Sequence, residues 1–329
     1  MTTAAKSIGI RPATVSNLCT GKIDLGKAEV RTLVGLATLA NCSVDELIIR
    51  GEKVQMIETG IKALDFFAPL VKEGTTGLVA RPGMGQLVIL AELLHNFKAS
   101  KYKTLFLLPE VEHKELDGTV DLADVTTTSI EETLGKFRDS TSEVIFITDR
   151  SYVVSGELLD LQEKLLEENM SPVTTILVDL SGEVVDEDIP YGPLETVWQL
   201  DAELVARHYY PAVHPLYSTS SLLEGVDLDQ RHFTLRQRAI KLLRRYRELR
   251  AFVAVHGTGR IPASETETYE RGSRLEAYFT QPFAVAEEFT KQPGTSVALS
   301  DTLNDVETIL DGKMDEVQVE SLKFVGALS

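Results

Sequence analysis

Cysteine is nearly absent from this sequence. The two cysteines, Cys19 and Cys42, lie in short helical contexts, with no C-x-x-C spacing and no histidine nearby. This scarcity excludes a disulfide framework, argues against a zinc site and is typical of a protein in a reducing interior. We therefore expect no metal site and a cytoplasmic location.

Long apolar runs are missing as well. No stretch reaches the roughly 18 consecutive apolar residues that suggest a membrane-spanning helix. The opening residues, MTTAAKSIGI, contain no apolar run long enough for a signal peptide. These two absences predict a soluble protein without membrane insertion.

Positive charge is in short supply. The chain has 33 Lys and Arg against 50 Asp and Glu, a net charge of −17. Residues 1–50 carry six basic and four acidic residues, so the remainder has 27 against 46, a net of −19. An acidic surface repels a phosphate backbone, which argues against a body coated in nucleic acid. The first fifty residues differ from the rest in being weakly basic. A chain of 329 residues is long enough for two or three domains.

Residues 1–51 have the pattern of short helices joined by tight turns. Pro12 can open a helix without losing a hydrogen bond, and Gly21 can end it. A second helix is predicted over about 27–39, and Ser43 with Glu46 forms a capping box for a third. Short helices at this spacing are typical of small helical modules.

This pattern resembles the Cro/repressor type of helix-turn-helix. The matching residues are Ala5, Gly9, Ile10, Thr14, Val15, Ser16, Leu18, Gly21 and Lys22, followed by Leu33, Leu36, Ala37, Leu39, Ser43 and 45–47. The resemblance implies that the helix from Pro12 enters the major groove of DNA, with Ala13 and Asn17 over base edges. Asn17 would read a base, typically adenine. Arg11 and Lys22 would contact phosphates.

Two departures leave an alternative open. Pro12 and Ala13 offer no hydrogen bonds where such proteins often carry Gln, Arg or Ser, and the first helix of the motif is missing. The alternative is a helical module used for docking to another protein. DNA binding through residues 1–50 is therefore one of two interpretations.

The body of the chain alternates strand-like and helix-like segments. Apolar strand-like runs occur at 104–108, 143–147 and 174–178, with helical stretches such as 154–168 between them. Such alternation predicts an α/β fold with a parallel sheet covered on both faces. Beyond Tyr210 the pattern becomes helical, with segments at 235–255, 268–279, 282–290 and 301–311.

Three segments of the body resemble the catalytic (beta) subunit of rotary ATP synthases. They are IETGIKALDFFAPLVKEGTTGLV before a glycine-rich turn, YPAVHPLYSTS at 210–220, and TQPFAVAEEFTKQPGTSVALSDTLNDVETILDGKMD at 280–315. The resemblance covers about 52–325. It implies a RecA-like P-loop domain with a degenerate nucleotide site at 52–222 and an α-helical C-terminal domain at 223–329. The helix-turn-helix at 1–51 replaces the family's β-barrel.

The phosphate loop of that family, G-G-A-G-V-G-K-T, aligns with ARPGMGQL here. The resemblance assigns a degenerate nucleotide site to Arg81, Gly83, Met84, Gly85, Gln86 and Leu87. Gln86 replaces the lysine that reaches the β- and γ-phosphates, and Leu87 replaces the hydroxyl that holds Mg²⁺. Pro82 removes a backbone donor. A lost charge-assisted hydrogen bond, worth roughly 1.5–3 kcal/mol, lowers phosphate affinity by about one to two decades.

The remaining catalytic positions are altered too. An ungapped alignment puts Val111 on the general base, although Glu110 and Glu112 flank it. The metal-binding aspartate that ends a later strand aligns with Thr148, with Asp149 one residue beyond. Because phosphoryl transfer depends on positioning and charge neutralisation, these changes predict no catalytic residue and no ATP hydrolysis. Residual ATPase activity through Glu110 or Glu112 is the less favoured alternative.

The aromatic residues around the family's adenine are retained. The resemblance assigns this role to Tyr210, Phe283 and Phe289, which match residue for residue. Aromatic walls can hold a base by stacking without phosphate chemistry. The implied cofactor is an adenine nucleotide, ATP or ADP, without catalytic Mg²⁺. The alternative is that the three rings are core residues retained for packing.

These patterns favour a pseudoenzyme with a DNA-binding head, acting as a transcription regulator or another DNA-associated protein. We expect a homo-oligomer or an ATPase-like partner subunit, because oligomerisation would add avidity to a weak head.

Two further features of the sequence bear on this interpretation. The acidic loop that couples the family to its shaft is replaced by residues 257–272, and the 231–250 region is basic. The basic region suits a solvated face that balances the acidic body, or a basic surface for nucleic acid or an acidic partner. The competing interpretation is an assembly protein that caps or mimics an ATPase ring.

Overall fold

The computed structural model describes residues 14–15, 28–40, 44, 55–111, 113–180, 194–223 and 229–328. The chain divides into two compact units, Met1–Lys53 and Val54–Ser329. In the first unit, helix α3 (Val30–Ala40) buries Leu33 and Ala37, which share one helical face. The four expected DNA contacts, Arg11, Ala13, Asn17 and Lys22, lie outside the described residues.

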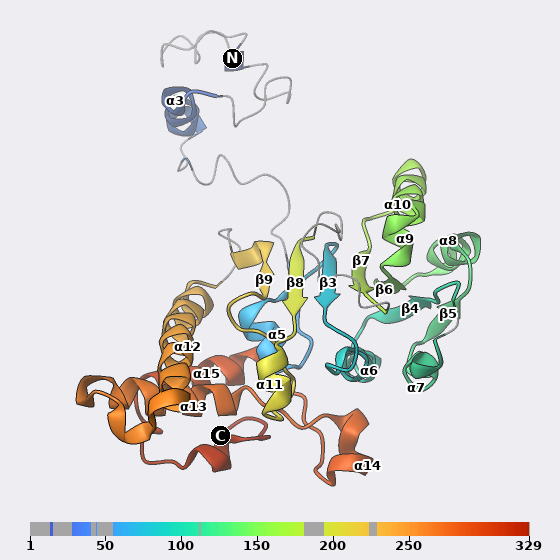
Figure 1. The fold of residues 1–329 in the computed structure, drawn as a ribbon. Helices are drawn as coiled ribbons and strands as arrows, with labels where there is room; N and C mark the ends of the chain where they lie inside the picture. The colour runs from blue at the N-terminus through green and yellow to red at the C-terminus, as the bar shows by residue number, and fades with distance from the viewer. Residues whose placement is uncertain are drawn as a thin grey trace. The chain divides into compact units, whose positions relative to one another are not determined.

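The second unit is built on a seven-stranded sheet with the order β5-β4-β6-β7-β3-β8-β9 (Figure 1). Its strands are β3 (Thr75–Val79), β4 (Lys103–Leu107), β5 (Val125–Thr127), β6 (Val144–Asp149), β7 (Thr174–Val178), β8 (Thr196–Gln199) and β9 (Thr219–Ser220). All pairings are parallel except that of β8 with β9. The predicted α/β class with a parallel sheet is thus confirmed. A separate pair, β1 (Met56–Ile57) and β2 (Leu70–Val71), is antiparallel.

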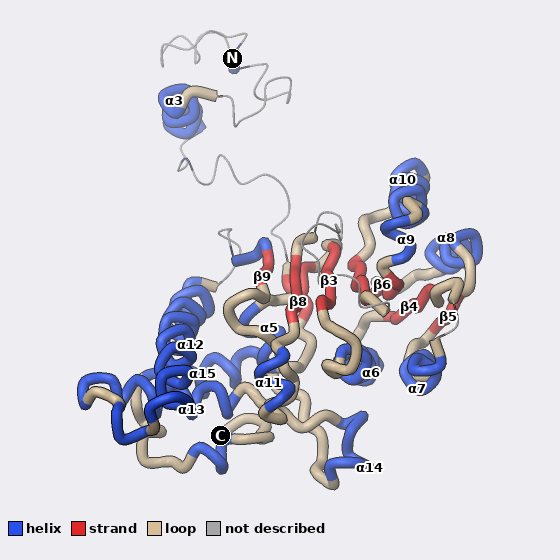
Figure 2. Tube along the Cα trace, viewed as in Figure 1, coloured by secondary structure: helices blue, strands red, loops and turns tan. Residues whose placement is uncertain are grey.

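Helices cover both faces of the sheet (Figure 2). One face carries α6 (Gln86–Lys98) and α7 (Asp117–Val120), and the other carries α8 (Ile130–Asp139), α9 (Ser151–Val154) and α10 (Glu157–Glu167). Successive side chains of a strand point to opposite faces. Accordingly, Ile145 and Ile147 pack in the core with α6, while Phe146 packs in the core with α8 and α10. Burial on both faces explains why these strands are continuous apolar runs.

A helical region follows the sheet within the same unit. Its helices are α12 (Gln230–His256), α13 (Thr266–Tyr278), α14 (Glu287–Thr290) and α15 (Leu299–Leu310), with the 3-10 turn η6 (Ala284–Ala286) before α14. It packs against α5 (Lys62–Phe67) through aromatic rings. The ring centroid of Phe279 lies 5.2 Å from that of Phe66 and 4.5 Å from that of Phe67. The shorter helix α11 (Ala202–Ala206) follows β8.

A buried lysine connects α5 to this helical region. Lys62 Nζ donates to the carbonyl oxygens of Tyr278 at 2.5 Å and of Val325 at 2.9 Å. The Tyr278 hydroxyl in turn donates to Asp305 at 2.9 Å. Burial lowers the pKa of Lys62 to about 7, although the charge of Asp305 opposes this. The segment around Val325 is therefore held to α5 by a polar group inside the core.

The basic residues of α12 mostly face acidic side chains of neighbouring elements. The ion pairs are Arg231–Glu307, Arg238–Asp311, Arg245–Glu265, Arg247–Asp201 and Arg250–Glu276. Arg236 instead donates to the carbonyl oxygen of Phe67 at 2.8 Å. Lys241 and Arg244 are exposed and form no ion pair within the described part of the chain. Most of the positive charge on this helix is therefore neutralised within the protein.

Within the described ranges, no helix combines the length and the apolar character that crossing a membrane requires.

Candidate functional site

The loop between β3 and α6 is closed by a β-turn at 81–84. The backbone N–H of Met84 donates to the carbonyl oxygen of Arg81 at 3.2 Å. Gly83, at the third position of the turn, has φ +80°, and Pro82 precedes it. A type II turn needs a residue that tolerates positive φ at its third position, usually glycine, and it often has proline at its second. Gly85, with φ +92°, then caps the start of α6.

The turn uses backbone donors that a phosphate-binding loop would direct at its ligand. The N–H of Arg81 donates to Met84 Sδ at 3.3 Å, and the N–H of Met84 closes the turn. Pro82 has no N–H. The N–H groups of the first turn of α6 have no partner within the helix, as at any helix N-terminus. The turn therefore leaves the N–H groups of Arg81 and Met84 unavailable to a ligand.

The side chains at positions 86 and 87, which the sequence resemblance aligns with a phosphate-loop lysine and hydroxyl, pack into the protein. Gln86 is buried at the start of α6, and Leu87 packs against the hydrophobic core. Arg81, the one basic residue in the loop, is exposed. None of these three residues lines the pocket beside the loop.

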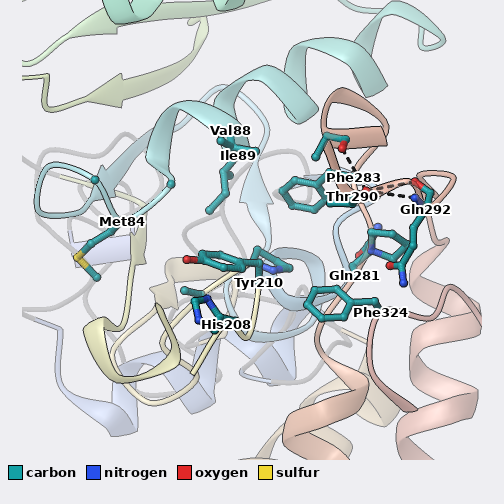
Figure 3. A pocket seen from close by; sticks show the side chains of 16 residues that line it. Met84, Val88, Ile89, His208, Tyr210, Gln281, Phe283, Thr290, Gln292 and Phe324 are labelled. Carbon is teal, nitrogen blue, oxygen red and sulfur yellow. Dashed lines mark hydrogen bonds between the residues drawn. The ribbon is translucent and has the colours of Figure 1, made fainter. Parts of the chain in front are cut away.

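That pocket has a volume of about 480 Å³ (Figure 3). It is formed by the residues Gly83, Met84, Gly85, Val88, Ile89, His208, Tyr210, Pro211, Ala212, Gln281, Pro282, Phe283, Ala286, Thr290, Gln292 and Phe324. They come from the loop with α6, from the segment after α11, from the η6–α14 region and from the chain near Phe324. No Lys, Arg, Asp or Glu is among these lining residues, so the pocket is mainly apolar.

Two of the three expected aromatic residues meet at this pocket. Tyr210 and Phe283 both line it, and Tyr210 lies so close to the loop that a Cβ on Gly85 would be 3.9 Å from its ring. Phe289 does not line it, since its side chain is 88% exposed on α14. Ala286 and Thr290, which lie before and after Phe289 in the sequence, form part of the wall.

Other lining residues had no signal in the sequence analysis. Phe324 supplies a third ring, and Figure 3 shows it across the pocket from the helix that carries Val88 and Ile89. The Phe324 N–H donates to the Thr280 hydroxyl at 2.7 Å. Ile89 could have been found, because it lies four residues after Gly85 on the helix that starts at the loop. The position of Phe324 depends on tertiary contacts alone.

Gln281 joins the segments that resemble the ATP synthase beta subunit. Its side-chain amide donates to the carbonyl oxygens of Gly60 at 2.8 Å and of Thr295 at 2.5 Å. Its side-chain oxygen accepts the N–H of Lys62 at 2.9 Å, and its own N–H donates to the carbonyl oxygen of Tyr210 at 2.9 Å. All the polar atoms of this side chain are therefore used in holding the walls of the pocket.

Glu92 fixes the η6 wall to α6. Its two carboxylate oxygens accept the N–H groups of Ala284 and Val285, each at 3.1 Å. Glu92 is buried, and burial raises its pKa while the two backbone donors lower it. The helix that starts at the loop and the segment that carries Phe283 are thus connected directly.

Among the described residues, the carboxylates beside the positions that the resemblance aligns with catalytic residues do not line the pocket. Val111 is exposed, and Glu110 lines a separate cleft of about 280 Å³ together with other acidic residues. Asp149 is buried at the end of β6, where its side chain accepts the N–H groups of Ser151 at 2.9 Å and Leu180 at 3.0 Å. The hydroxyl of Thr148 faces the carbonyl oxygen of Leu107 at 3.5 Å. Glu112 lies outside the described residues.

No group of three His, Cys, Asp or Glu among the described residues is arranged to hold a metal ion.

A scan against protein-family models found no family that matches this chain. The candidate site is therefore defined by its geometry, which combines an apolar pocket, aromatic walls and a glycine-rich loop at the carboxyl end of a central parallel strand. Such a pocket can bind a flat, largely apolar ligand.

Proposed function

We propose that this chain is a non-hydrolysing relative of the rotary ATP synthase beta subunit that binds an adenine-containing ligand in the pocket beside the 80–85 loop. The observation that supports this most is the meeting of Tyr210 and Phe283 at one apolar pocket, next to a loop in which the resemblance aligns Gln86 and Leu87 with catalytic residues. Aromatic side chains bind bases by stacking, and this needs no phosphate chemistry.

The fold agrees with this proposal. The loop follows β3, which lies between β7 and β8 inside the sheet, and β8 leads to the segment that carries Tyr210. In open α/β sheets, ligands bind outside the carboxyl ends of the strands. The strand order, with the loop at the end of an inner strand, is compatible with a RecA-like domain.

Hydrolysis does not fit the residues around the pocket. No Asp, Glu, Lys or Arg is among the lining residues, which include one histidine, His208, and Asp149 is used by backbone donors. A general base must come within hydrogen-bonding distance, or within one bridging water, of the proton that it removes. The ligand would therefore act as a regulatory signal that is bound but not hydrolysed. The head at 1–51 would bind DNA.

The test is calorimetric titration of the full chain with adenosine, ADP and ATP in the absence of Mg²⁺, together with an assay of phosphate release from Mg·ATP. We expect saturable binding and no turnover above a protein-free blank. Tyr210→Ala should weaken binding, whereas Tyr217→Ala should not, because Tyr217 is exposed outside the pocket and stacks on His214. No heat with any of the three compounds at millimolar concentration would refute the proposal.

An assembly or interaction protein is the second candidate. Phe289 is 88% exposed, and Val88, at the pocket, is also exposed. Contiguous apolar surface is found where partner proteins dock, and these two side chains would contribute to it. In that case Phe289→Ala would weaken association with another subunit and leave the binding of small ligands unchanged.

A further inference from the structure

The lining contains no Asp, Glu, Lys or Arg, and several of its polar groups are already engaged. The Gln281 side chain is fully used by backbone groups of the walls. The Thr290 hydroxyl donates to the carbonyl oxygen of Ala286 at 3.1 Å. Figure 3 shows Gln292 close to Thr290 on the same wall. Within the described residues, the lining thus offers stacking surfaces and few free hydrogen-bonding groups.

The ionisable groups around the pocket carry both signs. Glu92 accepts the N–H groups of Ala284 and Val285, and Glu287 accepts the N–H of Gly294 at 2.7 Å. His208 lines the pocket, and Lys291 lies between the lining residues Thr290 and Gln292. Residues 51–329 have a net charge of −19. The N-terminus of α6 contributes a small positive potential. A triphosphate would therefore meet the negative net charge of residues 51–329 and find no Lys or Arg among the lining residues.

The loop adds little to offset this. Its turn consumes the N–H groups of Arg81 and Met84, and Pro82 has none. Gln86 is neutral and buried, and it does not reach the pocket. Hydrogen bonds to a charged donor are about twice as strong as neutral ones, and here that donor is absent.

We propose that the pocket selects the uncharged part of its ligand, a purine nucleoside or free base, and that phosphate groups do not increase the affinity. This inference rests on the proposed function and narrows the class of ligand to the uncharged nucleoside or base. The ring is bound between Tyr210, Phe283 and Phe324, and the rest of the molecule stays outside the loop.

The experiment compares adenine, adenosine, AMP and ATP as sodium salts, titrated into the full chain without Mg²⁺ at two salt concentrations. We expect adenosine to bind at least as tightly as ATP at low salt. Raising the salt should improve only the binding of the phosphorylated compounds, since screening weakens repulsion between like charges. Tenfold or tighter binding of ATP relative to adenosine would overturn this inference but leave the proposed function intact. If no compound binds, both this inference and the proposed function are refuted.

A variant tests the same inference by changing the loop of the protein instead of the ligand. The double substitution Gln86→Lys with Leu87→Thr restores a cation and a hydroxyl to the loop. It should raise ATP affinity about tenfold and leave adenosine unchanged. Equal changes for both compounds would contradict the inference, because the loop would then affect the ring rather than the phosphates. The ranking of ligands by the unmodified chain decides the matter if this variant does not fold.

Discussion

Glu92 and Ala284 are connected by a hydrogen bond of 3.1 Å from the N–H of Ala284 to the carboxylate of Glu92, between residues 192 positions apart in the sequence. The other oxygen of Glu92 accepts the N–H of Val285 at the same distance. Because α6 starts at the glycine loop and Ala284 directly follows Phe283, this carboxylate fixes the distance between the loop and an aromatic wall. The geometry of the pocket therefore depends on a residue that does not line it.

Replacing Glu92 with Gln should destabilise the protein. One carboxylate oxygen becomes an NH₂ group that faces a backbone N–H, so one buried donor loses its acceptor, at a cost of about 1–3 kcal/mol. Urea unfolding measures this change. Glu288→Gln is the control, because Glu288 is exposed on α14 and its substitution should change the free energy of unfolding by less than about 0.5 kcal/mol. Equal effects of the two substitutions would show that the Glu92 contact contributes nothing specific.

Stability should depend on pH through Lys62. Its pKa in the folded protein is about 7, below the ordinary 10.5, because of burial. Between these two values the unfolded chain binds more protons than the folded one, so this group raises the free energy of unfolding as the pH increases from 7 to 10.5. The full contribution is at most about 5 kcal/mol.

The measurement for Lys62 is urea unfolding at several pH values, compared with Lys62→Met. The difference in unfolding free energy between the two proteins should change with pH above 7 and stay constant below it. A constant difference over the whole range would mean that Lys62 titrates in the folded protein as it does in the unfolded chain.

The three rings at 283, 289 and 324 should respond differently to truncation. Phe283→Ala and Phe324→Ala remove parts of the pocket wall and should weaken adenosine binding about tenfold, as expected for the loss of a stacking surface. Phe289→Ala should leave the affinity within a factor of two, since its side chain is exposed. Titration calorimetry distinguishes the three. Loss of binding on Phe289→Ala would mean that α14 closes over the bound ligand.

The head should bind DNA if the resemblance of residues 1–51 to a helix-turn-helix reflects function. Fluorescence anisotropy with labelled duplexes should then show affinity that falls steeply as salt rises. Lys22→Ala should weaken binding to all sequences, whereas Asn17→Ala should mainly reduce discrimination between them. Salt-independent association, or none, would favour a head that docks to protein.

The alternation of buried apolar segments with helices was enough to predict the sheet. Strand β7 has the predicted bounds, 174–178, and β6 runs to Asp149 where a strand ending at 147 was expected. Short strands such as β9, with two residues, leave no periodic signal. Burial on both faces produces a strong pattern, whereas edge strands depend on their neighbours.

The candidate site was less accessible to sequence analysis. Matched motifs identified Tyr210 and Phe283, and they also identified Phe289, which the structure places outside the pocket. A residue-by-residue match gives the identity of a side chain but not the direction in which a short helix such as α14 turns it. Phe324 was missed because its place depends on tertiary contacts. Its N–H donates to the Thr280 hydroxyl, and Lys62 holds the adjacent Val325.

The pocket brings together residues from 83 to 324, that is, from nearly the whole length of the second unit. A ligand can bind only when these distant segments have assembled, so binding is coupled thermodynamically to global folding. At a concentration one hundred times its dissociation constant, such a ligand stabilises the folded state by about 2.7 kcal/mol. A rise in the melting temperature of the unit can therefore identify the physiological ligand among many compounds without any assay of activity.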